Sequence, residues 1–362
     1  MNTPRILRNA FISVTFLLPL TQLLTAASFT TFDVPGAVNG TFPSSINSAA
    51  VITGYFNDEN FVSHGFLRGQ NGTIITFDVP GAANGTFPNV INSAGVVAGI
   101  FADENFLAHG FIRAQNGAIT TFDVPEATGG FFFLSAINPV GTIIGSLFDE
   151  NFLTTGFVRA QAGNIITIDI PSAVNGSQAV AINPTGVVAG TYTDADFVSH
   201  GFLRANNGAL TTFDPPAPGF MEPFAQFSFG PLLSITPQGV IAGSYFEPNP
   251  GNPFGGNFRV FVRATDGAFT TFDAATYEPC CIWSFPSGIN PAGTITGSFN
   301  DGFTINHGFV RTNTGSITTF DVPGAGTGFN QGTAPLGITA EGVIMGLYID
   351  PNYGYHGFLR LP

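Results

Sequence analysis

The stretch DENFLAHGFIRAQNGAITTFDVP, residues 103–125, indicates the fold because the chain repeats it. Residues 58–80 read DENFVSHGFLRGQNGTIITFDVP, with the same acidic start, the same His-Gly-Phe segment and the same Phe-Asp-Val-Pro ending. A unit that recurs this closely indicates a repeat architecture, in which each copy folds as one supersecondary unit and packs against its neighbours.

Two landmarks of this unit recur seven times. The aspartate of the ending stands at Asp33, Asp78, Asp123, Asp169, Asp214, Asp273 and Asp321, at intervals of 45 to 59 residues. The arginine after the HGF segment stands at Arg68, Arg113, Arg159, Arg204, Arg263, Arg311 and Arg360. Two copies depart from the pattern, since Thr155 and Arg259 stand where the others have histidine. A period near 45 residues with strand-like segments is typical of the blades of a β-propeller.

Each copy predicts four short strands. In the second copy they are residues 87–92, 95–101, 108–114 and 118–124, separated by glycine-containing turns. The run VPGAANGT then ends the last strand and crosses to the next copy.

The two ends of the chain predict the topology. Residues 28–35, SFTTFDVP, read as a fourth strand, and residues 356–362, HGFLRLP, read as a third strand. Pairing the two would remove two exposed sheet edges. The sequence therefore predicts an all-β fold, a single seven-bladed β-propeller over residues 28–362, closed by the N-terminal strand joining the last blade.

The phrases HGFL-R, IN-x-x-G and NG-x-x-TTFD resemble those of a family of extracellular repeat proteins called the HAF family, named for a His-Ala-Phe triplet that here reads His-Gly-Phe. The resemblance covers essentially the whole of residues 28–362. It implies secretion and a propeller-like array of repeats, and it implies no enzyme activity.

Residues 1–27 predict a signal peptide. Arg5 and Arg8 precede the apolar run AFISVTFLLPLTQLL, and small residues follow at Thr25-Ala26-Ala27. We therefore expect the protein to be secreted or held at the cell envelope, with no transmembrane span after cleavage. An uncleaved N-terminal anchor is the alternative.

The composition excludes one class of partner. The chain has a formal net charge of −13, and its ten basic residues are all arginine. Such an acidic surface repels phosphate backbones, so nucleic acid is excluded as a partner. The 40 phenylalanines are predicted to fill the core of a β-rich protein, which we expect to be a monomer.

The acidic segments join the second and third strands of each copy, so their carboxylates should share one face. They suggest a calcium site, since hard cations take several oxygen ligands. The candidate ligands are Asp58, Asp103, Asp149, Asp194, Asp301 and Asp350. The alternative is a charged rim that keeps a Phe-rich protein soluble, with no cofactor.

The five histidines of the HGF segments allow two strand registers. One register places His109 across from Asp123, as a hydrogen bond that ties the third strand to the fourth. A register one residue different places Phe111 opposite Phe122 instead, and the sequence leaves both open.

Three segments break the repeat: residues 215–230, residues 246–257, and residues 275–286, which contain Cys280 and Cys281. These cysteines are adjacent and allow a vicinal disulfide, an interchain bond or free thiols. The three segments are predicted to form a wall on the acidic face, beside the central funnel. The predicted ligand-binding residues are Phe220, Glu222, Phe224, Glu247, Tyr277, Glu278 and Trp283. The alternative is that these segments only cover blade edges.

No common catalytic motif occurs in the sequence. The sequence therefore favours a secreted, non-catalytic binding module whose acidic face engages a glycan or a cell-surface protein. One alternative is an extracellular glycan-active hydrolase or lyase, with Glu222 and either Glu247 or Glu278 as its carboxylates. Another is a structural surface-repeat protein.

Overall fold

The computed structural model describes residues 27–215, 233–249, 252–275, 283–302 and 305–362. Every regular element in these ranges is a β-strand, so they contain no helix long and apolar enough to cross a membrane. The predicted signal peptide, residues 1–27, lies outside the described residues except for its last residue.

The strands form repeated four-stranded antiparallel groups, which we call blades. One blade consists of β6 (Thr86–Ile91), β7 (Val97–Ala102), β8 (Ala108–Arg113) and β9 (Ile119–Phe122), paired in that order. The four strands predicted for this copy are thus confirmed, with ends shifted by one or two residues.

Three further blades are separate sheets with the same strand order. Their strands are β2 (Thr41–Ile46), β3 (Ile52–Asn57), β4 (Ser63–Arg68) and β5 (Ile74–Phe77); β10 (Phe132–Ile137), β11 (Ile143–Phe148), β12 (Thr154–Arg159) and β13 (Ile165–Thr167); and β14 (Ser177–Ile182), β15 (Val188–Thr193), β16 (Ser199–Arg204) and β17 (Leu210–Phe213).

The remaining strands are connected through two single parallel pairs, Phe258 with Trp283 and Asn306 with Gly332, into one 12-stranded sheet. These strands are β18 (Leu233–Ile235), β19 (Ile241–Asn249), β20 (Asn252–Arg263) and β21 (Phe269–Phe272); β22 (Trp283–Ile289), β23 (Ile295–Asn300), β24 (Asn306–Arg311) and β25 (Ile317–Phe320); and β26 (Gly332–Ile338), β27 (Ile344–Ile349), β28 (Tyr355–Arg360) and β1 (Phe29–Phe32).

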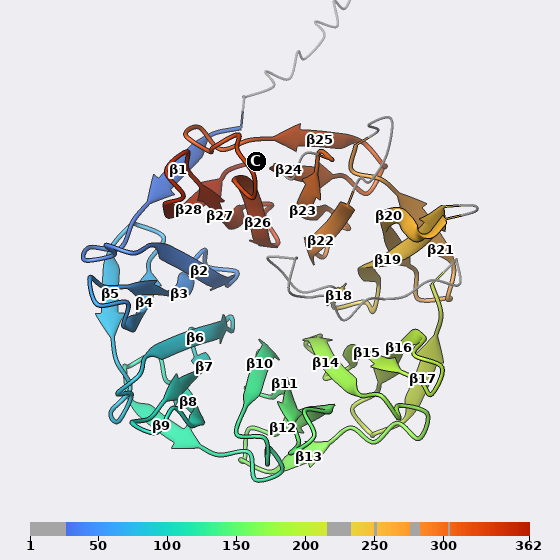
Figure 1. Cartoon of the computed structure of the whole chain (residues 1–362), viewed down its shortest axis with the longest axis horizontal. Coiled ribbons are helices and arrows are strands. Elements are labelled where there is room, and N and C mark those ends of the chain that lie inside the picture. Colours follow the sequence, from blue (N-terminus) through green and yellow to red (C-terminus); the bar gives the residue numbers. More distant parts are fainter. Residues whose placement is uncertain (1–26, 216–232, 250–251, 276–282, 303–304) are drawn as a thin grey trace, which may run out of the picture.

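The first strand of the described chain pairs with the last. β1 runs antiparallel to β28, with Phe29 opposite Arg360 and Phe32 opposite Gly357. Figure 1 shows the blades following one another around a common centre, with the first strand of each blade nearest that centre.

The core lies between neighbouring blades. One cluster joins Val90 and Ala98 of the β6–β9 blade to Leu134 and Phe157 of the β10–β13 blade. Phe122 belongs to the same contact, and its side chain occupies the space beside Gly110. A Cβ atom at Gly110 would lie 2.3 Å from Cζ of Phe122, so the third strand needs glycine there. The HGF glycine therefore makes room for the phenylalanine of the Phe-Asp ending.

An arginine from the following blade covers that phenylalanine. The guanidinium carbon of Arg159 lies 4.4 Å from the ring centroid of Phe122, within the range of a cation–π contact. Five other arginines of the HGF segments make the same contact, at 4.5 to 5.0 Å. The strand-end arginine therefore links blades.

The sequence predicts that residues 246–257 form a loop between the second and third strands of their copy, and this prediction is largely wrong. β19 and β20 continue to pair there, with Glu247 opposite Asn257 and Pro248 opposite Gly256. The rings of Phe246 and Phe258 lie 5.2 Å apart and hold the two strands together, so the insertion lengthens a hairpin.

Candidate functional site

Each acidic segment is a compact turn organised by its aspartate. In the β6–β9 blade, Oδ1 of Asp103 accepts hydrogen bonds from the backbone N–H groups of Asn105, at 2.8 Å, and Leu107, at 2.9 Å. The N–H of Phe106 donates to the carbonyl oxygen of Asp103. The turn is therefore held by its own side chain, as in an Asx turn.

This turn forces an aromatic residue into the left-handed backbone region. Phe106 has φ of 61°, which is rare for a bulky side chain and costs conformational energy. Equivalent residues in four other blades have φ between 60° and 65°, and the side chains of all five are 55–73% exposed. The five residues are Phe61, Phe106, Phe152, Phe197 and Tyr353, and we call them the aromatic arc.

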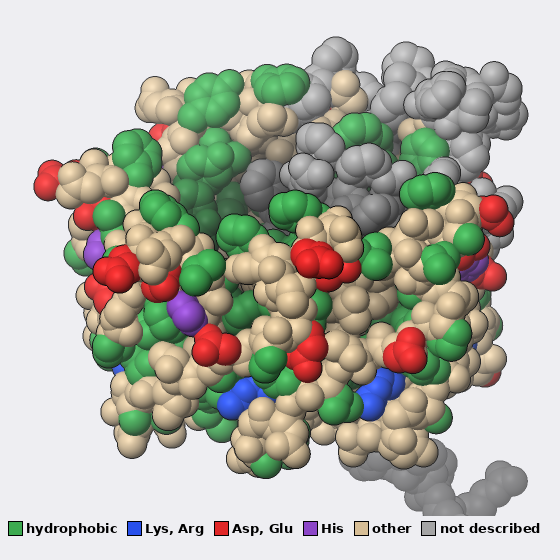
Figure 2. All heavy atoms as spheres, turned by 60° about the horizontal axis from the view of Figure 1, so that its bottom comes forward, with side chains coloured by type: hydrophobic (Ala, Val, Ile, Leu, Met, Phe, Trp, Pro, Cys, Tyr) green, Lys and Arg blue, Asp and Glu red, His purple; other side chains and the backbone are tan. Residues whose placement is uncertain are grey.

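The aromatic arc comes from consecutive blades, from the one containing β28 to the one containing β16 (Figure 1). The crossings between blades lie on the same face as the acidic turns, because the side-chain amide of Asn175 donates to the carbonyl oxygen of Asp194 at 2.6 Å. Asn39 and Asn84 make the same contact in their own blades. Figure 2 shows carboxylates and hydrophobic side chains interspersed over one side of the molecule.

The aromatic arc was not predicted from the sequence, because the phenylalanines were expected to fill the core. The signal was present, since an aromatic residue stands three positions after the aspartate in each of these turns. Such a residue lies beyond the end of the second strand, where the inward alternation of a strand no longer applies.

In five blades a histidine of the third strand lies between two carboxylates. Nδ1 of His109 is 2.6 Å from Oδ1 of Asp123, and Nε2 is 3.5 Å from Oδ2 of Asp103. Gly110 pairs with Phe122, so His109 faces Asp123 and the first of the two predicted registers is confirmed. His64, His200, His307 and His356 have the same pair of carboxylate neighbours.

These contacts shift the pKa values of both partners. The pKa of His109 is raised, chiefly by its hydrogen bond to Asp123, while burial opposes the shift. Hydrogen bonds to Asp carboxylates also raise the pKa values of His200 and His307 against the effect of burial. The pKa of Asp103 is lowered, mainly by the backbone N–H of Leu107.

The two blades without this histidine differ from each other. In one, Thr155 leaves the position without a cation. In the other, Arg259 donates to Glu247 at 2.8 Å and to Asp273 at 2.9 Å. Burial would lower the pKa of Arg259, but the two carboxylates raise it above its ordinary value. A cation therefore still lies between two carboxylates in this blade, with arginine in place of histidine and Glu247 in place of the turn aspartate.

The six candidate calcium ligands lie one to a blade. Five use Oδ1 to cap their own turns, as Asp149 does toward Asn151 and Leu153. In the sixth, the N–H of Ile305 donates to Oδ1 of Asp301 at 3.3 Å. Within the described ranges no group of three or more His, Cys, Asp or Glu side chains is placed to hold a metal ion. Calcium binding by these residues stays a prediction.

Two of the seven predicted ligand-binding residues are described. Glu247 is in the ion pair with Arg259, and the Trp283 ring meets Phe258 edge to face with centroids 5.8 Å apart. Phe220, Glu222, Phe224, Tyr277 and Glu278 lie outside the described residues, as do Cys280 and Cys281. The predicted wall stays a prediction.

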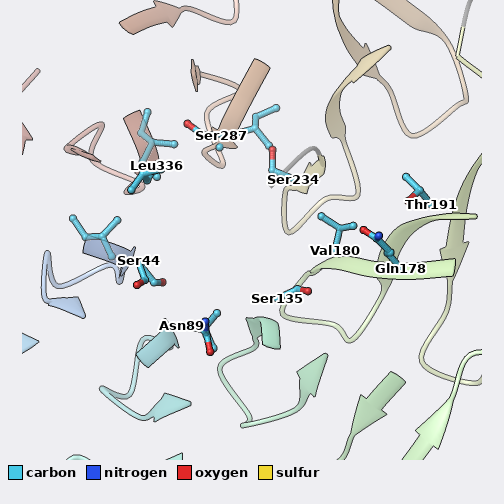
Figure 3. A pocket seen from close by; sticks show the side chains of 16 residues that line it. Ser44, Asn89, Ser135, Gln178, Val180, Thr191, Ser234, Ser287 and Leu336 are labelled. Atoms are coloured by element: carbon cyan, nitrogen blue, oxygen red, sulfur yellow. The ribbon is translucent and has the colours of Figure 1, made fainter. Parts of the chain in front are cut away.

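A cavity of about 450 Å³ lies at the centre of the molecule (Figure 3). The first strand of every blade contributes to its lining, from β2, β6, β10, β14, β18, β22 and β26. Six of these strands contain a β-bulge, and the extra residue lines the cavity in each. A bulge redirects a side chain relative to the regular alternation. The extra residues are Ser44, Asn89, Ser135, Val180, Ser287 and Leu336.

Comparison with solved structures identifies the fold as a β-propeller. The chain resembles a streptogramin B lyase with a TM-score of 0.57 and 17% sequence identity, covering 93% of this chain and 98% of that one. It resembles virginiamycin B lyase from Staphylococcus aureus with a TM-score of 0.59 and 14% identity, covering 93% of this chain and 100% of that one. No protein-family model and no curated protein sequence matches the chain.

Proposed function

We propose that this chain is a secreted, non-catalytic binding module built on a closed, seven-bladed β-propeller. The pairing of β1 with β28 supports closure, and so does the central cavity, which the first strand of every blade lines. Secretion through residues 1–27 and the relationship to the HAF family belong to the same proposal.

The aromatic arc is the observation that carries the binding function. Burial of these rings would lower the free energy of the protein by about 1.5–3 kcal/mol for each side chain, yet the turns hold them in solvent. A strained backbone repeated at equivalent positions is common in ligand-binding sites. Five such rings on consecutive blades suit an extended or repeating ligand, because each weak contact adds to the next.

The chemistry of the face favours a glycan. Aromatic rings stack on the apolar faces of sugar rings, and the carboxylates of Glu59, Glu104 and Glu150 beside the arc can accept hydrogen bonds from hydroxyl or amino groups. The acidic surface repels polyanions. The proposed ligand is therefore a neutral or amino-bearing glycan, and a cell-surface protein is the other outcome that the test distinguishes.

A second candidate is a glycan-active lyase or hydrolase. The observation that favours it is the similarity to two proteins named as lyases, although identities of 14–17% extend only to the fold. Under this candidate Glu222 and Glu278 act as catalytic carboxylates. The double variant Glu222→Gln/Glu278→Gln would then abolish turnover of a bound glycan, whereas a binding module shows no turnover in either form.

The test is a glycan array probed with residues 28–362, once with calcium and once with a chelator. We expect binding to neutral or amino-bearing glycans, which is lost when all five aromatic-arc residues are replaced by serine. The matched control is Ile75→Ser/Ile166→Ser, which removes exposed apolar side chains from the outer strands β5 and β13. Loss on chelation would assign calcium to the acidic turns.

Two outcomes would contradict the proposal. The first is that no glycan on the array binds in either condition, while the wild type but not the five-serine variant captures a purified cell-surface protein. The ligand would then be a protein. Concentration-dependent self-association without any ligand would favour a structural surface-repeat protein. Secretion is tested separately by N-terminal sequencing of exported protein, which should begin at Ser28.

A further inference from the structure

The central cavity has a lining unlike the rest of this acidic protein. None of its described lining residues is charged, and none is aromatic. Hydroxyl and amide side chains line most of it, together with aliphatic side chains such as Val180 and Leu336, as Figure 3 shows for the labelled residues. Its volume of about 450 Å³ lies within the range typical of small-molecule sites.

Several polar side chains of this lining lack a partner. Ser44, Ser135 and Gln178 make no side-chain hydrogen bond within the part of the chain that the structure describes. Oδ1 of Asn89 and Oγ of Ser234 are buried and likewise unpaired. Buried polar atoms are normally hydrogen-bonded, and leaving one unpaired costs about 1–3 kcal/mol. Those two atoms are closed off from solvent, whereas Ser44, Ser135 and Gln178 are half-buried. A molecule in the cavity can therefore supply the partners that these three side chains lack.

The cavity lining varies between copies at a position where the backbone does not. The HGF glycine of the third strand is present in six copies and the arginine that ends that strand in all seven. The bulged residue of the first strand instead changes from Ser44 to Asn89, Val180 and Leu336 around the ring. The bulge supplies a fixed position, and the side chain at that position differs from blade to blade. Such a lining can recognise an asymmetric molecule.

From these features we propose that the cavity is a binding site for a neutral mono- or disaccharide. Phosphates, carboxylates and amines do not fit, because an ion taken into an uncharged cavity loses its hydration without gaining a counter-charge. Flat heteroaromatic ligands find no ring to stack on. A neutral sugar supplies hydroxyl groups for the amides and hydroxyls, and it presents apolar C–H faces to Val180 and Leu336.

The test uses protein-observed NMR on residues 28–362. The probes are neutral sugars (glucose, galactose, mannose, N-acetylglucosamine, maltose and lactose) and two anionic matches (glucuronate and glucose 6-phosphate), each at about 20 mM, which detects millimolar binding. At least one neutral sugar should shift the side-chain amide signals of Asn89 and Gln178 and saturate. Neither anion should shift them.

Two variants locate the site. Gln178→Leu and Ser135→Ala should each weaken binding of that sugar by about tenfold, which corresponds to one lost hydrogen bond. Both should fold, because each removes an unpaired polar atom. Phe106→Ser, in the aromatic arc, should leave the affinity unchanged, so this site and the proposed function fail independently.

Three results would overturn the proposal. The first is the absence of any shift with every sugar, which would mean a water-filled channel only. The second is an equal response to glucuronate. The third is unchanged affinity in both Gln178→Leu and Ser135→Ala.

Discussion

Replacing Phe122 with alanine should destabilise the protein through the contact between two blades. The ring fills the space beside Gly110, packs against Phe132 at 6.3 Å between centroids, and lies under Arg159. A fully buried Phe→Ala change costs about 3–5 kcal/mol. Phe122 is only partly buried, so we expect about 2–3 kcal/mol, of which the cation–π contact contributes about 0.5–1 kcal/mol.

The assay is urea denaturation of Phe122→Ala, Arg159→Met and the double variant. A double-mutant cycle should give a coupling of about 0.5–1 kcal/mol between the two side chains. The control is Phe106→Ala, whose 67% exposed ring should change the free energy of unfolding by less than about 0.5 kcal/mol. Equal effects at Phe122 and Phe106, or zero coupling to Arg159, would refute the packing argument.

Three further predictions concern glycine, histidine and Arg259. A Cβ atom at Gly99 would lie 2.3 Å from the backbone oxygen of Phe87, so Gly99→Ala should destabilise the protein by about 3 kcal/mol or more, measured by thermal melts. The control is Gly69→Ala, at a position where four other copies carry alanine, and it should be neutral or stabilising. Because the pKa of His109 is raised in the folded protein, its ion pairs stabilise the fold fully at pH values below the ordinary pKa of 6.5. This stabilisation is lost as the pH rises through the folded-state pKa, so the melting temperature should fall from pH 6 to pH 8, and His109→Gln should reduce that fall. Arg259→Met should lower the free energy of unfolding by about 1 kcal/mol at low salt, since the ion pair with Glu247 is partly exposed. The difference between variant and wild type should shrink in 1 M NaCl, and a loss independent of salt would count against the ion pair.

The repeat made the strands predictable. In the second copy the recurring landmarks located each strand within about two residues, and the ends of the sequence pointed to the pairing that β1 makes with β28. The register of the third and fourth strands was not predictable, because a shift of one residue also gives a plausible set of neighbours. The structure selects the His–Asp register, since a ring fits opposite Gly110 and a side chain in place of that glycine does not.

The aromatic arc and the bulges could not be predicted from the sequence pattern, for a different reason. Alternation predicts which side of a strand a residue faces, but Phe106 follows the strand and takes its position from the turn of Asp103. A bulge shifts the inward–outward alternation of a strand by one residue, and no particular residue type marks its position, as Ser44 and Leu336 illustrate. Glu247 and Arg259 both depart from the repeat in the same copy, but only the structure shows that these two side chains form an ion pair.

The central claim is that the N-terminal strand closes the ring of blades. The claim is central because the shared loop face and the central cavity both depend on this closure. The most direct test is a disulfide between cysteines at Ser28 and Leu361, whose backbone groups are joined by a hydrogen bond of 2.9 Å and whose side chains are exposed. We predict rapid intramolecular oxidation of Ser28→Cys/Leu361→Cys, read by mass spectrometry of unreduced digests. The matched pair Thr31→Cys/Leu361→Cys should stay reduced, since three residues along a strand place it about 10 Å out of register. Equal oxidation of both pairs, or disulfides only between molecules, would contradict a closed propeller.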